Sequence, residues 1–408
     1  MTISPPSPTI PALDTGFATE TEAPRWVGVG QSAAIDAAVA GREAAAAALA
    51  GRAAALVMVF CSERFDRPTL LAAIRRESGG AALIGCSTAG EIATTGASEA
   101  SVVVMALGGP GFSVKTAIGT DASSDLRGAG AAAAACLAGV ADRPYRVLLL
   151  LSDGLAGDQQ EIVRGAYSVT GASVPLVGGC AGDDLKMQAT HQLYGDAVFT
   201  NAVIGAAIGS DAPLGIGVRH GWRRVGDPML VTRSANNRVY ELDDRPALDA
   251  YLERLNAPED ARTDPAAFTQ FAQTHPLGIN RRSGEEPARF VAEANFEDRS
   301  LGCIAEVPQG GLAWLMEGDV DSVLAATDSA CVDALAPLGG EAPIGLVAFD
   351  CIARKGVLGG PGVSDEVARV TRHAAGAPVA GFYTYGEIAR TQGISGFHNQ
   401  TLVILALG

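Results

Sequence analysis

Two short motifs near opposite ends of the chain carry residue types that could do chemistry. Gly85–Glu91 has the sequence Gly-Cys-Ser-Thr-Ala-Gly-Glu, and Gly381–Glu387 has Gly-Phe-Tyr-Thr-Tyr-Gly-Glu. A hydroxyl and a carboxylate just after a strand are typical of a polar ligand contact, because open α/β sheets bind ligands at strand ends. Alternatively, Gly permits a special backbone conformation and Glu caps backbone amides. Both hypotheses stay open at this point.

A thiol and a His-Asn pair extend this candidate site. Cys86 opens a turn after an apolar segment, where a nearby base could activate a thiolate. Phe382 takes its place in the second motif, which favours packing instead. His398 and Asn399 precede the last apolar segment and could line a pocket or form a polar turn. The predicted ligand-binding residues are Cys86, Ser87, Thr88, Glu91, Tyr383, Thr384, Glu387, His398 and Asn399.

A third cluster surrounds His220. The stretch Arg219–Arg224 combines an imidazole, an indole and three guanidinium groups. Such a set could hold haem, with His220 as the axial ligand and arginines on the propionates. His191 is the second candidate ligand. An edge strand with solvated charges explains the same residues.

The segments around the two end motifs also repeat, which predicts how the motifs are held. Apolar stretches at 56–60 and 346–349 precede the motifs, and others at 102–105 and 402–405 follow them. A weaker third copy spans 147–208, where Gly179-Cys180 resembles Gly85-Cys86. Continuously apolar strands with helical segments between them predict a helix-covered sheet, so the fold class is α/β to α+β.

Capping residues predict two of the helices in the second half. Ser364 suits the N-cap of a helix that ends near Gly376, and Asp319 suits the N-cap of a helix from Val320 to about Leu335. Short alternating segments between 214 and 317 predict an antiparallel meander. We therefore expect a disordered proline-rich tail at 1–24, a first domain at 25–214 and a second at 215–408.

Composition excludes several classes of function. The chain has 30 basic and 45 acidic residues, a formal net charge of −15, which disfavours nucleic acid as a partner. Seven Cys without a C-x-x-C pair indicate reduced thiols in a cytoplasmic protein. No apolar stretch is long enough to span a membrane, and no secretion signal is visible. The phosphate-binding loop, zinc-protease, EF-hand and Rossmann motifs are absent.

Together, the motifs at 85–92, 178–184, 381–388 and 397–401 resemble the FIST family of sensory proteins, FIST N followed by FIST C. The resemblance implies a module that senses small molecules such as amino acids. One branch of the family binds haem and senses nitric oxide beside histidine kinases or cyclic-di-GMP enzymes. No residue match is specific enough to transfer a haem ligand from that branch.

These observations predict a cytoplasmic signal-transduction protein that binds an amino-acid-like molecule in an inter-domain cleft. No output domain is recognisable after the FIST C region, so we expect the signal to pass to a separate partner, such as a histidine kinase or a cyclic-di-GMP enzyme. One alternative is a haem-binding nitric oxide sensor, which would make haem the cofactor. Another is an enzyme that uses Cys86, or Glu91 and Glu387, on a small polar substrate.

Overall fold

The computed structural model describes residues 25–280, 287–391 and 396–408. The predicted tail at 1–24 lies outside the described residues. The predicted fold class is confirmed, because the chain forms mixed sheets covered by helices together with one antiparallel sheet.

Three units of the same topology make up the body of the protein. The first unit contains β1 (Trp26–Ser32), α1 (Ala37–Leu49), β2 (Leu56–Cys61), α2 (Arg67–Ser78), β3 (Ala82–Ser87), β4 (Glu91–Ala93), β5 (Gly96–Ser98) and β6 (Val102–Gly108). β2 and β3 are parallel, and β6 runs antiparallel between β1 and β2. The strand order is therefore β1-β6-β2-β3.

The other two units repeat this order as β7-β12-β8-β9 and β13-β26-β22-β23. The second unit contains β7 (Phe112–Gly119), α3 (Leu126–Ala134), β8 (Tyr145–Ser152), α4 (Gln159–Thr170), β9 (Leu176–Cys180), β10 (Gln192–Tyr194), β11 (Ala197–Phe199) and β12 (Val203–Ser210). The third contains β13 (Leu214–Arg219), α7 (Val320–Leu335), β22 (Gly345–Cys351), α8 (Ile352–His373), β23 (Val379–Thr384), β24 (Glu387–Arg390), β25 (Phe397–His398) and β26 (Leu402–Leu407). The segments that share sequence motifs thus share a strand order.

The short hairpin of each unit pairs with the sheet of a neighbouring unit. β10 of the second unit pairs with β3, β4 of the first unit pairs with β23, and β24 of the third unit pairs with β9. The exchange is cyclic, so each sheet contains strands from two units. It brings the turns that follow β3, β9 and β23 close together.

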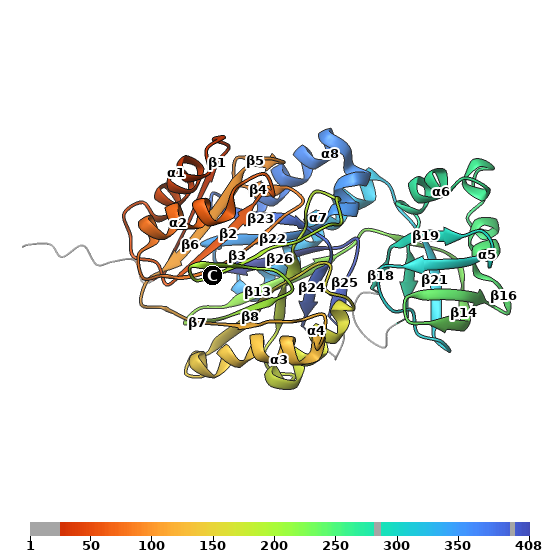
Figure 1. Cartoon of the computed structure of the whole chain (residues 1–408), viewed down its shortest axis with the longest axis horizontal. Coiled ribbons are helices and arrows are strands. Elements are labelled where there is room, and N and C mark those ends of the chain that lie inside the picture. The colour runs from red at the N-terminus through yellow and green to blue at the C-terminus, as the bar shows by residue number, and fades with distance from the viewer. Residues whose placement is uncertain (1–24, 281–286, 392–395) are drawn as a thin grey trace, which may run out of the picture.

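The third unit is interrupted between β13 and α7 by an inserted domain. Its eight-stranded antiparallel sheet contains β14 (Arg223–Ala235), β15 (Arg238–Leu242), β16 (Arg245–Pro246), β17 (Leu277–Ile279), β18 (Ala288–Arg289), β19 (Val291–Asn295), β20 (Ser300–Cys303) and β21 (Leu312–Glu317). The helices α5 (Ala247–Arg254) and α6 (Pro265–Ala272) cover it. Figure 1 shows this domain to one side of the three-unit body. We keep the predicted division at 214 as a proposal, since it falls at the start of β13.

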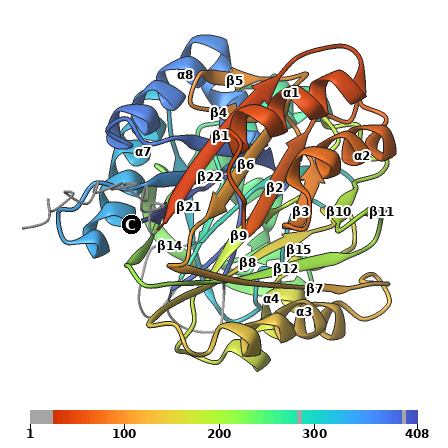
Figure 2. The same ribbon diagram turned by 90° about the vertical axis from the view of Figure 1, so that its left-hand side faces the viewer.

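Alternate residues along each strand point to different cores, which explains the continuously apolar strands. Met58 and Phe60 of β2 join Leu149 and Phe349 of the other units in one central core. Val57, between them, packs toward the helices of its own unit. Both faces of the strands are therefore buried, as the sequence predicted. Figure 2 shows the helix pairs on the outside of the strands.

One predicted helix boundary is correct and one is wrong. Asp319 caps α7 by accepting from the Ser322 amide, at 2.8 Å. Ser364 lies inside α8 and does not begin it. The helical path is broken earlier, at Gly359, where φ is 60° and ψ is 179°. The sequence Gly-Gly-Pro permits this break because Gly has no Cβ and Pro suits a first helical turn.

Candidate functional site

The larger of the two cavities described below lies between the inserted domain and the second and third units. Its volume is about 880 Å³. From the units, it is lined by Gly154, Leu155, Gly157, Asp158, Glu161, Arg164, Leu185, Met187, Cys351, Ile352, Ala353, Gly356, Tyr385 and Asn399. From the inserted domain, it is lined by Asn236, Asn237, Gln273, Phe290, Ala292, Ile304, Ala305 and Glu306. Half of these unit residues come from the turns after β8, β9 and β23, and most of the others from α4 and the start of α8, so the cavity lies at strand ends.

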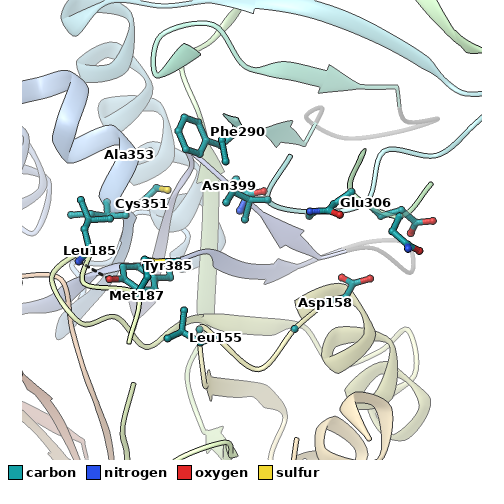
Figure 3. Close-up of a pocket in the computed structure, with 18 of the residues that line it drawn as sticks. Leu155, Asp158, Leu185, Met187, Phe290, Glu306, Cys351, Ala353, Tyr385 and Asn399 are labelled. Carbon is teal, nitrogen blue, oxygen red and sulfur yellow. Dashed lines mark hydrogen bonds between the residues drawn. The ribbon is translucent and has the colours of Figure 1, made fainter. Parts of the chain in front are cut away.

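Apolar side chains form the walls of this cavity. Leu155 and Phe290 line it from opposite domains, as Figure 3 shows. Leu185, Met187 and Ile304 also line it, although 61%, 56% and 41% of these residues is exposed. Large apolar side chains that gather in one exposed place mark a binding surface rather than a core. The cavity is thus suited to a ligand with an apolar portion.

Charged residues line another part of the cavity. Asp158 precedes the first turn of α4, and Glu161 and Arg164 lie on that helix. Arg164 forms ion pairs with Glu161 and, at 3.6 Å, with Glu306 of the inserted domain. Glu161 also pairs with Arg127, so three carboxylates are opposed by two guanidinium groups. The remaining negative balance favours a cationic group on a ligand.

Asn399 offers a hydrogen-bond acceptor to the cavity. The residue is 2% exposed, and it lines the cavity from the turn between β25 and β26. Its side-chain oxygen Oδ1 has no partner among the described residues. Figure 3 shows Asn399 facing the space between Phe290 and Leu155. A buried acceptor without a donor is costly, so this oxygen marks where a ligand could donate a hydrogen bond.

The cavity also contains a thiol that is unsuited to nucleophilic attack. Cys351 is buried, and its thiol is hydrogen-bonded to Glu387. Burial, followed by the nearby Glu387 charge, raises the pKa of this thiol well above its usual range. Since the thiolate is the nucleophile, Cys351 stays in its unreactive form near neutral pH.

The structure places the predicted glutamates at a joint between strands rather than in the cavity. Glu91 accepts from the Ser101 amide at 3.0 Å, and Glu387 accepts from the Thr401 amide at 3.2 Å. Each also accepts a hydrogen bond from the Thr three residues earlier. In the second unit Gln192 accepts from the Ala202 amide at 3.3 Å. In all three units, therefore, the first residue of the hairpin caps an amide just before the last strand.

Burial affects the protonation of these two carboxyls. It raises the pKa of Glu91 to about 7 and that of Glu387 to about 8, despite hydrogen bonds that lower them. The folded protein therefore binds protons that the unfolded chain, with pKa values near 4.5, has lost. The contribution of these two carboxyls to the free energy of unfolding is therefore complete below about pH 4.5 and is lost as the pH rises through their folded pKa values.

We expect the amide found at Gln192 to remove this pH dependence at the other two positions. Glu91→Gln and Glu387→Gln should each raise the free energy of unfolding at pH 8 by about 2 kcal/mol and change it little at pH 4.5. Urea unfolding at both pH values measures the effect. Glu259→Gln, at a side chain that is 92% exposed, is the control. Equal effects at both pH values would contradict the prediction.

The other predicted ligand residues also lie away from the cavity, and of the nine only Asn399 lines it. Cys86 is fully buried, and burial raises the pKa of its thiol well above its usual range, which disfavours a thiolate. Ser87 donates to the Gly182 carbonyl at 2.8 Å. Tyr383 is buried behind Lys355, and His398 contacts the Ala389 carbonyl at 3.0 Å. Ligand contact by these residues therefore stays a prediction.

Neither histidine of the haem hypothesis lines either cavity. The His220 Nδ1 atom accepts from the Trp222 amide at 2.9 Å. His191 is half-buried, and burial, followed by the Arg67 charge, lowers its pKa. The arginines near His220 contact separate partners, since Arg219 pairs with Asp333 and Arg223 with Asp319. This arrangement gives no support to haem, and ligation by either histidine stays a prediction.

Two further observations apply to the described residues alone. The described residues contain no group of three or more His, Cys, Asp or Glu side chains suited to hold a metal ion. None of their helices combines the length and the apolarity that crossing a bilayer requires.

A smaller cavity of about 590 Å³ adjoins the first and shares Leu185, Ile352 and Gly356 with it. Lys355 lines it and pairs with Glu99 at 3.1 Å.

Sequence reasoning missed most of the larger cavity because its residues come from turns without a common motif. The turn after β8 and the end of β20 share no pattern with the end motifs. The sequence feature that could have indicated this cavity is the presence of two large apolar residues, Leu185 and Met187, in the polar segment after β9. In such a segment, a Leu and a Met suggest an exposed contact.

Comparison with known proteins identifies the family. The FIST N domain matches residues 55–245, and the FIST C domain matches residues 247–390. The chain belongs to the FIST family. FIST domains are associated with sensing in signal transduction. The junction of the two matches falls in β16 of the inserted domain, so both include part of this insertion.

One relative of this FIST protein is an uncharacterized protein of Methanocaldococcus jannaschii. The two are 25% identical over 157 residues, which is 36% of this chain and 30% of the relative. The matched region thus spans less than a third of the relative's length.

Proposed function

We propose that this FIST protein is a sensor whose small-molecule ligand binds in the 880 Å³ cavity between the inserted domain and the second and third units. A cavity of this size and a location between domains are typical of small-ligand sites. Ligand contact with both sides would favour one arrangement of the two domains. A separate signalling protein, such as a histidine kinase or a cyclic-di-GMP enzyme, would then respond to that arrangement.

The unpartnered Asn399 oxygen is the observation that carries this proposal. Burying an acceptor without a partner destabilises the folded protein, and such costs are typical of functional sites. An N–H or O–H group of a ligand would satisfy it.

The cavity lining supports an amino-acid-like ligand. The carboxylates of Asp158 and Glu306 would attract an ammonium group, and Arg164 could exchange its partly exposed pair with Glu306 for a carboxylate of the ligand. Leu155 and Phe290 would contact an apolar side chain.

Binding to a panel of amino acids and related primary amines tests the proposal. We expect members with an apolar side chain to raise the melting temperature and to show saturable heat in calorimetry. Asn399→Leu should weaken the binding about tenfold or more, because a lost hydrogen bond to a buried group is worth about 1–3 kcal/mol. Without ligand, the same variant should be at least as stable as the wild type.

Gln270→Leu adds an apolar side chain at an exposed position of α6 and is the control. It should leave binding unchanged. If no member of the panel binds, or if Asn399→Leu binds as tightly as the wild type, the proposed site is wrong.

A further inference from the structure

A buried cluster of ionisable groups lies directly behind the cavity wall formed by the start of α8. Arg354 is fully buried, and its Nε atom donates to Asp350 Oδ1 at 2.8 Å. Its Nη2 atom donates to Glu366 Oε1 at 2.5 Å. Asp350 is 0% exposed and Glu366 is 2% exposed. Ala353 and Gly356, which lie one and two residues from Arg354 in the chain, line the cavity.

This cluster joins the two segments of α8 to the elements around them. Arg354 lies before the break at Gly359, and Glu366 lies after it. Thr327 of α7 donates to Glu366 at 2.7 Å. Arg354 also donates to the His220 carbonyl at 2.8 Å, at the point where the chain leaves β13 for the inserted domain. The cluster therefore connects the cavity wall with the start of the inserted domain.

The charges of the cluster do not balance if both carboxyls are ionised. Two carboxylates would then face one guanidinium without contact with water, which leaves one buried negative charge uncompensated. The second oxygens, Asp350 Oδ2 and Glu366 Oε2, receive no hydrogen bond from a donor group. The two carboxyls are also within hydrogen-bond reach of each other. Two carboxyls within such a short distance of each other cannot both ionise at low cost, and one of them keeps a proton.

We propose that Asp350 and Glu366 share one proton, and that this proton holds the two segments of α8 together and so controls the position of the cavity wall. Asp350 then donates to Glu366, while both carboxyls still accept from Arg354. Loss of the proton sets two carboxylates against each other, which moves the segments apart. This regulation of the cavity rests on the proposed function, whereas the shared proton does not.

Neighbouring groups favour retention of the proton. Burial and the Glu366 charge raise the pKa of Asp350 well above its usual range, and Arg354 opposes them only in part. The titratable groups that face the cluster are Arg354 of α8, Cys331 of α7, Cys351 and Tyr383 at the strand ends, and Glu387 of β24. The stabilisation is complete below the unfolded pKa near 3.8 and is lost as the pH rises through the folded pKa.

Amide substitutions test the shared proton without any ligand. Asp350→Asn keeps the acceptor for Arg354 and donates permanently to Glu366, so we expect it to fold and to remove a pH-dependent part of the stability. In infrared difference spectra at pH 6, the wild type should show a protonated carboxyl band that Asp350→Asn lacks, in addition to the bands of Glu91 and Glu387 that both proteins share. The double variant Asp350→Asn/Glu366→Gln should lose more stability than the two single changes together, because Arg354 then has no carboxylate partner.

Hydrogen exchange tests the consequence for the cavity wall. As the pH rises, amide protection over 351–358 should fall in the wild type, after correction for intrinsic exchange rates, and should stay constant in Asp350→Asn. Helix α1 provides the internal reference.

An unchanged carboxyl band in Asp350→Asn would overturn the shared proton. If Asp350→Asn lacks the band but amide protection over 351–358 in the wild type stays constant as the pH rises, the proton does not control the cavity wall. Neither outcome bears on whether the cavity binds a ligand, which the amino acid panel decides separately.

Discussion

Replacing Arg354 by methionine is expected to lower the free energy of unfolding by about 3–5 kcal/mol, because it leaves two buried carboxyls without their cation. The affected groups are the fully buried Asp350 and Glu366, each in direct contact with the guanidinium. Urea unfolding at pH 7 measures the loss.

Arg369→Met on the same helix is the matched control. Arg369 pairs with Asp328 at the surface, where both side chains are about one-third exposed. Exposed ion pairs contribute at most about 1 kcal/mol, so this change should have a small effect. Comparable losses in the two variants would show that burial of the Arg354 cluster has no special role.

Replacing Gly356 by leucine is expected to weaken ligand binding strongly while preserving the fold. Gly356 lines both cavities from α8, and the nearest atom to a Cβ placed there is Gln273 Oε1 at 4.0 Å. A leucine therefore fits without a clash in the empty protein, and its side chain takes up ligand space. We expect affinity to fall about 100-fold, by the larger of the usual costs of overpacking. Stability should rise by up to about 1 kcal/mol, because leucine favours a helix more than glycine does.

Gly356→Ala separates these two effects. Alanine gives the same gain in helix stability and occupies little of the cavity, so binding of the amino acid panel should change little. Calorimetry on both variants measures the difference. Tight binding by Gly356→Leu would contradict the placement of the ligand, whereas unfolding of this variant would contradict the free space around Gly356.

Much of the fold could be predicted from local patterns. The strands are continuously apolar because both faces are buried, and Asp319 begins α7 because it caps an amide. The start of α8 could not be predicted in this way. Ser364 has the right residue type, but the β22 strand leads directly into the helix and the break occurs at Gly359.

The candidate site was less predictable than the fold. The sequence predicted the glutamates of the end motifs as ligand-binding residues, yet Glu91 and Glu387 cap backbone amides, as the uncharged Gln192 does. Asn399 was predicted next to them, but the cavity that its unpartnered oxygen lines is completed by the inserted domain, which contributes Phe290.

The sequence by itself determined the family, the fold class and the recurring turn chemistry. These depend on residues close together in the chain, such as Thr88 and Glu91, whose interactions are set by local geometry. Only the tertiary structure decided which unit receives each hairpin, because any strand edge offers the same backbone donors and acceptors. The tertiary structure also forms the cavity and the Asp350–Arg354–Glu366 cluster, because both bring together segments that are distant in the chain. Burial in these places then sets the protonation and charge of the side chains.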